Sequence, residues 1–138
     1  MQEPIASSSP DIDGDVIEVR LPAAATHLPV LRTFTADLAA RLDFNLDEVA
    51  DLRMAVDEAC SGLVARAVTA TKLICSYRIE DDALWVIAAA QTTDGAVPAR
   101  DTFGWRVLTA LVDKVETESQ DSRLVTVKLY KRRTGTVA

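Results

Sequence analysis

The sequence predicts an α+β fold: a two-layer α/β sandwich in which three helices cover one face of a mixed, mainly antiparallel sheet. Two observations lead to this prediction. The hydrophobic period changes several times along the chain, between the alternation of strands and the spacing of amphipathic helices. Strands that follow one another are separated by short turns, which favours antiparallel pairing. The predicted order is strand, two helices, two strands, helix and two strands.

The first strand and the first helix are predicted between residues 16 and 42. The segment VIEVRL (16–21) alternates apolar and charged residues, as a half-buried strand does. Residues 26–42 repeat apolar side chains at helical spacing, with Thr26 suited to cap the helix and Pro29 tolerated in its first turn. The expected inward stripe is Leu28, Leu31, Thr35, Leu38 and Leu42, with Phe34 beside it.

A second helix is predicted over residues 47–68, after the break at DFN (43–45). Asn45 or Asp47 can cap its first turn. The expected inward stripe of this helix is Val49, Leu52, Val56, Ala59, Leu63 and Ala67.

Two strands joined by a tight turn follow the second helix. The segment KLICSYRIE (72–80) alternates, whereas ALWVIAAAQ (83–91) is apolar on both faces, which favours a central strand with Trp85 in the middle of the sheet. The remaining predicted elements are a helix, a short strand and a last strand, over residues 103–115, 115–119 and 123–131. Their expected inward residues are Val107, Leu108, Leu111, Val115, Val125, Val127 and Leu129.

The chain of 138 residues has the length of one domain with one core. That domain is expected over residues 15–131. Residues 1–14 are rich in Ser, Pro, Asp and Gly and predict a disordered tail, and residues 132–138 predict a second, flexible tail.

Composition and charge exclude several classes of function. The formal net charge of −6 argues against nucleic-acid binding, which needs a basic surface, but it permits a basic protein partner. No apolar run is long enough to cross a membrane, and no signal peptide pattern opens the chain, so a cytoplasmic protein is expected. Cys60 and Cys75, with His27 as the single histidine, form no metal pattern, and both thiols are expected in the core.

The segment VDEACSGLV (56–64) raises the question of function. A glycine inside a helix is less stable than alanine by roughly 1 kcal/mol. At about 100° per residue, Glu58 and Gly62 lie on one flank of the core stripe, so the carboxylate and the open glycine can form the wall of a ligand site. The alternative is a solvated glutamate beside a glycine that accommodates a close neighbour.

The order of elements and the segment LRMAVDEACSGLV (52–64) resemble the RsbW-type anti-sigma factors and serine-protein kinases of the GHKL, or Bergerat-fold, ATPase family. The resemblance extends from Val16 to Lys131. It implies a Bergerat-type sandwich and a catalytic base at Glu58. It also implies an asparagine that holds the magnesium of ATP four residues later, where this chain has Gly62.

The other nucleotide-binding positions that the resemblance implies are altered as well. Of the glycines expected in a lid before the third helix, only Gly104 is present. Arg100 and Thr102 occupy the other two places, and Gln91 or Thr92 stands where an adenine-binding aspartate is expected. Three further residues complete the implied set: Asp94 and Gly95 as a displaced remnant of the adenine motif, and Thr126 as a nucleotide-binding threonine.

These departures predict that ATP binding is weak or lost. Glycine offers no ligand to magnesium, and arginine and threonine restrict the backbone where phosphates would approach. The resemblance then implies an anti-sigma factor that binds a sigma subunit of RNA polymerase and is released by an antagonist. The alternative is an active serine kinase that uses ATP and magnesium to phosphorylate its STAS-type anti-anti-sigma antagonist. A third alternative is an acidic α/β domain with an unrelated partner.

The outer side of the first helix is the predicted partner-binding face. A solvated helix face usually carries charge, whereas this one is small and weakly polar. Its residues are Pro29, Thr33, Ala36 and Ala40, with Arg32 and Asp37 on the edges. The resemblance implies sigma contacts and a homodimer near this helix. The alternative is that the alanines are only good helix formers on an exposed surface.

Overall fold

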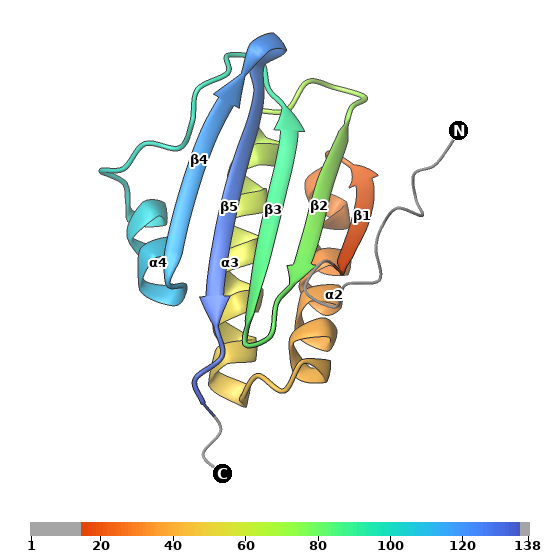
Figure 1. Ribbon diagram of the computed structural model, residues 1–138. Helices are drawn as coiled ribbons and strands as arrows, with labels where there is room; N and C mark the ends of the chain where they lie inside the picture. Colours follow the sequence, from red (N-terminus) through yellow and green to blue (C-terminus); the bar gives the residue numbers. More distant parts are fainter. Residues whose placement is uncertain (1–14, 136–138) are drawn as a thin grey trace.

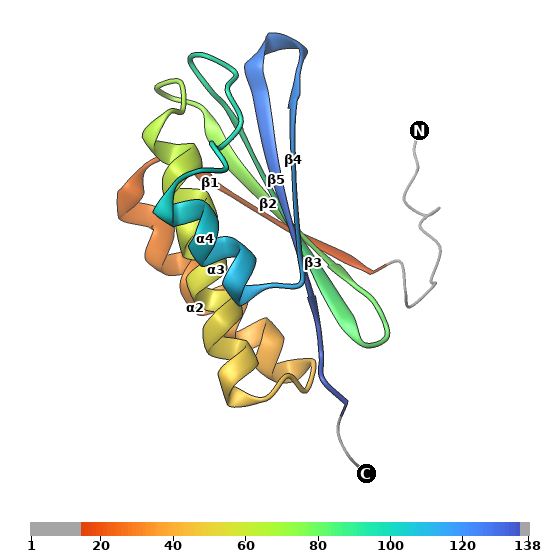
Figure 2. The same ribbon diagram turned by 90° about the vertical axis from the view of Figure 1, so that its left-hand side faces the viewer.

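A five-stranded sheet and three α-helices on one of its faces make up residues 15–135, the part of the chain that this computed structural model describes (Figures 1 and 2). The strand order is β1-β2-β3-β5-β4, and every neighbouring pair is antiparallel. The two-layer class is therefore confirmed, with a sheet more uniform than the mixed one expected. The elements are β1 (Val16–Pro22), the 3₁₀ turn η2 (Ala25–His27), α2 (Leu28–Arg41), α3 (Leu46–Ala65), β2 (Lys72–Ile79), β3 (Ala83–Gln91), α4 (Phe103–Leu111), β4 (Lys114–Gln120), the 3₁₀ turn η3 (Asp121–Arg123) and β5 (Leu124–Arg132).

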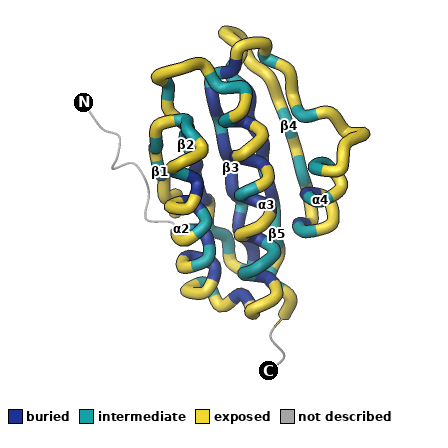
Figure 3. The backbone as a smooth tube through the Cα atoms, turned by 180° about the vertical axis from the view of Figure 1, so that it is seen from behind, coloured by how far each residue is buried: buried dark blue, intermediate teal, exposed yellow. Residues whose placement is uncertain are grey.

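The core lies between the helices and the sheet (Figure 3). The inward stripes predicted for α2 and α3 are buried along most of their length, and the structure adds Ala55 and Cys60. The core includes a polar contact between α2 and β2: the hydroxyls of Thr35 and Tyr77 are 2.7 Å apart. The cysteines Cys60 and Cys75 are buried free thiols, as expected.

α3 begins where the sequence predicts. The side chain of Asn45 accepts a hydrogen bond from the backbone N–H of Glu48, and the carboxylate of Glu48 accepts one from the N–H of Asn45. This reciprocal capping satisfies N–H groups that the first turn of a helix leaves without partners.

α4 is shorter than the helix predicted over residues 103–115. It ends at Leu111, and Val112 already has extended backbone angles. Val115, predicted on the inner side of the helix, belongs to β4 and pairs with Leu129 of β5. In the sequence, the apolar spacing typical of a helix continues past Leu111, because β4 also has an apolar inward residue near its start, Val115.

The second face of the sheet has no helix over it among residues 15–135 (Figure 2). β3 is the central strand, as predicted, but its outward side chains Trp85, Ile87 and Ala89 are only half-buried. β3 is thus apolar on both faces but fully buried only on the face beneath the helices. Trp85 instead packs against Tyr130 across the sheet surface, with ring centroids 4.9 Å apart.

The described domain extends beyond the boundary predicted at residue 131. β5 ends at Arg132, and the N–H and hydroxyl of Thr134 donate to the carboxylate of Glu48 at 2.8 and 2.7 Å. The predicted tail over residues 1–14 and the last three residues of the chain lie outside the described residues. Within residues 15–135, none of the helices has both the length and the apolar character needed to cross a membrane.

Candidate functional site

Three of the predicted site residues meet in a small cavity between α3 and α4. Glu58 and Gly62 face it from α3, and Gly104 faces it from the first turn of α4. Its volume is about 170 Å³. The other lining residues are Ala59, Pro98, Ala99, Thr102, Trp105 and Leu108. The flank that helical geometry assigned to Glu58 and Gly62 is thus the flank that faces α4.

Gly104 lies in close contact with the carboxylate of Glu58. A β-carbon added at Gly104 would lie 2.6 Å from Oε2 of Glu58, which is closer than such atoms pack. Negative charge at a helix N-terminus is favourable, because the first backbone N–H groups there have no partner in the helix. The carboxylate lies beside Gly104 in the first turn of α4, where that interaction is favourable.

The loop before α4 is held by side chains at the positions where the resemblance implies lid glycines. The hydroxyl of Thr102 accepts a hydrogen bond from the N–H of Trp105 and donates one to the carbonyl of Ala99. The guanidinium of Arg100 lies 5.0 Å from the centroid of the Trp105 ring. These residues cap and brace the helix, so the segment is built as a turn rather than as a glycine-rich lid.

The cavity does not fit a nucleotide with its magnesium. Sites for small molecules usually enclose about 300–1,000 Å³, against about 170 Å³ here. Magnesium takes oxygen ligands, and Gly62 supplies none from a side chain. The one carboxylate of the cavity, that of Glu58, lies against Gly104.

The predicted adenine-binding positions lie elsewhere, at the end of β3. The hydroxyl of the buried Thr92 donates to the carbonyl of Arg123 and accepts from the N–H of Gly95. The carboxylate of Asp94 pairs with the guanidinium of Arg66 through both oxygens at 2.9 Å, and this contact lowers the pKa of Asp94. Asp94 and Gly95 therefore form a tied turn and do not line the cavity beside Glu58.

Thr126 lies on the opposite face of the sheet from that cavity. Its neighbours Val125 and Val127 in β5 belong to the core beneath the helices. Because side chains alternate along a strand, Thr126 points to the other face, where it pairs with Ala89. The match of Thr126 to a nucleotide-binding threonine of the resembled family thus did not predict which face of the sheet its side chain occupies.

The predicted partner-binding residues line an open groove between α2 and α3. Its volume is about 810 Å³. From α2 it contains Pro29, Arg32, Thr33, Ala36 and Asp37, and from α3 it contains Arg53, Met54 and Asp57. Ala40 is exposed but lies beyond the groove. Arg32 bridges the two helices through a 2.8 Å ion pair with Asp57.

The α3 side of this groove was missed in the sequence. Arg53, Met54 and Asp57 are spaced at i, i+1 and i+4, which places them on one side of a helix. Met54 is the signal that could have found this side, because an exposed methionine among charged residues is typical of an adaptable binding surface.

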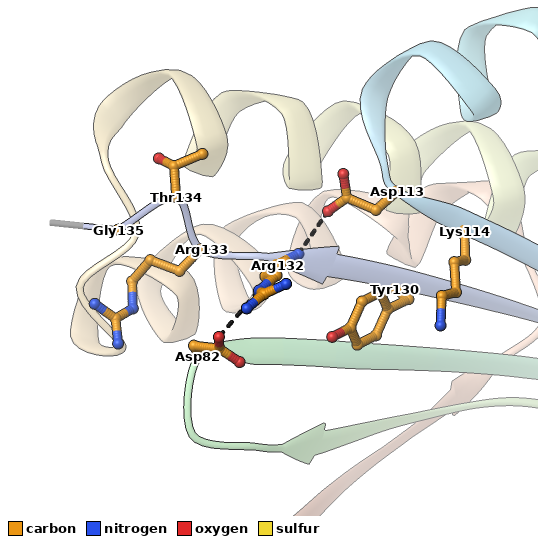
Figure 4. A pocket seen from close by; sticks show the side chains of 8 residues that line it. All are labelled: Asp82, Asp113, Lys114, Tyr130, Arg132, Arg133, Thr134 and Gly135. Atoms are coloured by element: carbon orange, nitrogen blue, oxygen red, sulfur yellow. Dashed lines mark hydrogen bonds and ion pairs between the residues drawn. The ribbon is translucent and has the colours of Figure 1, made fainter.

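A second hollow, of about 710 Å³, lies at the end of the sheet where β5 leaves it (Figure 4). Its polar groups bind one another: Arg132 pairs with Asp82 at 3.0 Å and donates its backbone N–H to Asp113 at 2.7 Å. The ammonium of Lys114 lies 4.8 Å from the centroid of the Tyr130 ring. None of the predicted site residues lines this hollow.

Gly62→Ala is expected to stabilise the protein by about 0.5–1 kcal/mol, because alanine favours helix more than glycine does. The added β-carbon would meet nothing within 4 Å, so the idea that this glycine accommodates a close neighbour is wrong. Thermal unfolding should show a rise of a few degrees in Tm. Ser61→Ala, at the exposed neighbouring position, is the control and should give a smaller rise. A lower Tm for Gly62→Ala would contradict this account.

Comparison with known proteins supplies relatives but no family model: none matches the chain. The anti-sigma-F factor RsbW of Mycobacterium tuberculosis (strain CDC 1551 / Oshkosh) is 36% identical over 103 residues, which is 73% of this chain and 60% of that protein. The serine-protein kinase RsbW of Bacillus subtilis (strain 168) is 31% identical over 80 residues, or 56% of this chain and 50% of that protein. The serine-protein kinase RsbW of Halalkalibacterium halodurans is 27% identical over 130 residues and 80% of both chains.

A solved structure supports the fold. The crystal structure of the RsbU and RsbW domains of a Mycobacterium tuberculosis protein superposes with a TM-score of 0.69 over 86% of this chain and 32% of that chain, at 14% identity. The chain spans about half to 60% of the length of the first two relatives described above. The resemblance inferred from LRMAVDEACSGLV is confirmed by these relatives.

Proposed function

Because this chain is homologous to the RsbW anti-sigma factors and serine-protein kinases, we propose that it is a cytoplasmic anti-sigma factor. It binds a sigma subunit of RNA polymerase and is released by a STAS-type anti-anti-sigma antagonist. Transcription from the promoters of that sigma subunit is repressed until the antagonist competes.

The contrast between two sites is the observation that carries this proposal. The groove between α2 and α3 is open, with a volume of about 810 Å³, and contains every residue of the predicted partner-binding face except Ala40. The cavity beside Glu58 is about 170 Å³ and lacks a magnesium ligand at Gly62. The chain thus keeps a surface suited to protein binding and has lost groups needed for phosphoryl transfer, which depends on positioning and charge neutralisation.

The groove combines features that recur at the centres of protein interfaces. It offers an exposed methionine, a proline and an alanine beside arginines from both helices. Methionine and arginine are enriched at interfaces relative to the rest of the surface. The side chains of the Arg32–Asp57 ion pair are 41% and 33% exposed. Exposed ion pairs contribute little to stability, so both groups can form ion pairs with a bound protein instead.

We expect no saturable ATP binding at physiological magnesium concentrations. The reason is the size of the cavity and the absence of a side-chain ligand at Gly62. Isothermal titration calorimetry with ATP and magnesium measures nucleotide binding directly. Gly62→Asn is the matched variant, because nothing lies within 4 Å of a β-carbon added at this position and an asparagine side chain therefore has room. A micromolar dissociation constant for the wild-type chain would contradict the prediction.

The kinase alternative is supported by the names of several relatives and by the presence of Glu58. If ATP bound, Glu58 would be the general base that accepts the proton of the attacking serine hydroxyl. Glu58→Ala would then abolish transfer to the antagonist while leaving nucleotide affinity nearly unchanged.

The experiment that tests the proposed function is calorimetric titration of the full chain with purified sigma subunits from the same genome. Saturable binding to one of them without nucleotide is the expected result, together with displacement by a STAS-domain antagonist. Binding that appears only with ATP and magnesium would favour the kinase alternative. No binding to any sigma subunit under either condition would leave the third class, an acidic domain with an unrelated partner.

A further inference from the structure

A row of four side chains crosses the open face of the sheet, the face that no helix covers among residues 15–135 (Figure 2). Arg78 of β2 is the register partner of Trp85 in β3, and Trp85 is the register partner of Tyr130 in β5. Tyr130 pairs in turn with Lys114 of β4. Side chains alternate along a strand, and the neighbours of these four residues pack in the core, so all four point to the open face.

The middle of this row is aromatic and its two ends are cationic. Trp85 and Tyr130 are half-buried and pack on each other, and the ammonium of Lys114 lies 4.8 Å from the centroid of the Tyr130 ring (Figure 4). Arg78 and Lys114 are exposed, and neither forms an ion pair with a carboxylate of residues 15–135. The row therefore presents an apolar surface between two cations that lack a carboxylate partner.

The open face is basic although the whole chain carries a net charge of −6. The outward positions of the five strands hold six cations and three carboxylates: Arg20, Lys72, Arg78, Lys114, Lys128 and Arg132 against Glu18, Glu116 and Glu118. Glu18 pairs with Arg20, Glu118 pairs with Lys128, and Glu116 lies opposite Lys128 in the register. The surplus of positive charge on this face favours an acidic partner.

The separation of the two unpaired cations determines which acidic partner fits. β3 and β5 lie between β2 and β4, and neighbouring strands are about 4.8 Å apart, so the backbones at Arg78 and Lys114 are about 14 Å apart. An extended peptide advances about 3.3 Å per residue, and its alternate side chains point the same way. Two residues four positions apart therefore span about 13 Å on one side of such a peptide, with a third side chain midway between them.

We propose that the open face binds an extended acidic segment of another protein, which lies across the strands of the sheet. Two carboxylates of this segment, four residues apart, pair with Arg78 and Lys114. The apolar side chain midway between them packs on Trp85 and Tyr130. This surface lies on the other side of the sheet from the groove between α2 and α3, so both can be occupied at once.

A single strand of nucleic acid is the less favourable occupant of the same face. Its bases would stack on the two aromatic rings, as they do on other protein surfaces. Its phosphates would continue past the row, however, toward the carboxylates of Glu18, Glu116 and Glu118. A short peptide with two carboxylates avoids this repulsion, because its negative charge is confined to the two ends of the row.

NMR titration of the isotope-labelled full chain with the peptide Gly-Ser-Glu-Ser-Leu-Ser-Glu-Ser-Gly tests the proposal. We expect saturable binding with a dissociation constant of roughly 0.1–1 mM. The indole N–H signal of Trp85 should shift, whereas that of Trp105, on α4, should stay in place. The peptide Gly-Ser-Glu-Leu-Ser-Glu-Ser-Ser-Gly has the same composition with its glutamates three residues apart, and it should bind at least fivefold more weakly.

Charge reversal identifies the two cations. Arg78→Glu and Lys114→Glu should each weaken peptide binding at least tenfold with little change in Tm, because both side chains are exposed. A peptide with lysines in place of both glutamates should bind the double variant to within a few-fold of the original pair. Lys72→Glu makes the same change at an exposed position of β2 outside the row and should alter the affinity less than threefold.

Several outcomes would overturn the proposal: no binding of the glutamate peptide, equal binding of the peptide of matched composition, or a shift at Trp105 instead of Trp85. Binding only after removal of residues 1–14, which contain Glu3, Asp11 and Asp13, would make that segment the occupant instead. Tighter binding of oligothymidylate than of the peptide would assign the face to nucleic acid. A shift of Trp85 on raising the concentration of the chain alone would assign it to a second copy. None of these results depends on sigma binding, so the proposed function is tested separately.

Discussion

Ala36→Arg is expected to weaken the proposed binding of a sigma subunit at least thirtyfold, about 2 kcal/mol, while the domain stays folded. Ala36 lies in the groove between α2 and α3, where its small side chain leaves space for a partner. An arginine there would occupy that space and bring a third cation beside Arg32 and Arg53. Calorimetry with the sigma subunit measures the change, and thermal unfolding checks the fold.

Ala110→Arg is the matched control, since it makes the same change at an exposed position of α4, away from the groove. Its affinity for the sigma subunit should equal that of the wild-type chain. If Ala36→Arg is folded and binds as tightly as this control, the groove is not the binding site. The loop over residues 92–102 would then be the next candidate surface.

Salt provides a second test of the same interaction. The chain carries a net charge of −6. The proposed sigma partner needs a basic surface where it contacts the phosphates of DNA. Complementary charge accelerates association more than it strengthens the final complex. The association rate should therefore fall as ionic strength rises, whereas the dissociation rate should change little.

Glu48→Ala is expected to destabilise the fold by about 2–4 kcal/mol, since hydrogen bonds to charged groups each contribute about 1.5–3 kcal/mol. Glu48 is 5% exposed, and its carboxylate accepts hydrogen bonds from the N–H of Asn45 and from the N–H and hydroxyl of Thr134. The substitution would remove the half of the capping interaction that the Glu48 carboxylate makes, leave the bond from the residue-48 N–H to Asn45, and release the segment after β5. Chemical denaturation measures the loss. Glu116→Ala, at an exposed glutamate of β4, is the control and should change stability by less than about 0.5 kcal/mol.

The same carboxylate gives the stability of the fold a predictable dependence on pH. Burial raises the pKa of Glu48, but the hydrogen bonds from Thr134 and Asn45 outweigh it, so the pKa is lowered in the folded chain. The ionised form is thus favoured by folding. Its contribution is complete above the ordinary glutamate pKa of about 4.3 and is lost as pH falls through the lower folded value. Glu48→Gln should make the free energy of unfolding less sensitive to acid. The prediction would be contradicted if the variant lost as much stability as the wild-type chain when the pH is lowered.

The spacing of apolar residues within each segment of the sequence determined most of the fold. The inward stripes of α2 and α3, the alternation in β2 and the cap at Asn45 depend on neighbours within one element, and each agrees with the structure. β1 forms as predicted but is more exposed than expected, with Ile17 37% exposed. The flank shared by Glu58 and Gly62 also follows from helix geometry alone, and both residues line the same cavity.

Other features were decided by contacts between elements. α4 ends at Leu111 because the chain then pairs with β5, and Asp94 is tied by Arg66 from the end of α3. Glu48 is held by Thr134, which is far from it in sequence. Periodicity shows which side of its own element a residue occupies, whereas the identity of the residue opposite depends on how distant segments pack. For that reason the sequence predicted the α2 side of the groove, and only the tertiary structure revealed that Arg53, Met54 and Asp57 of α3 complete it.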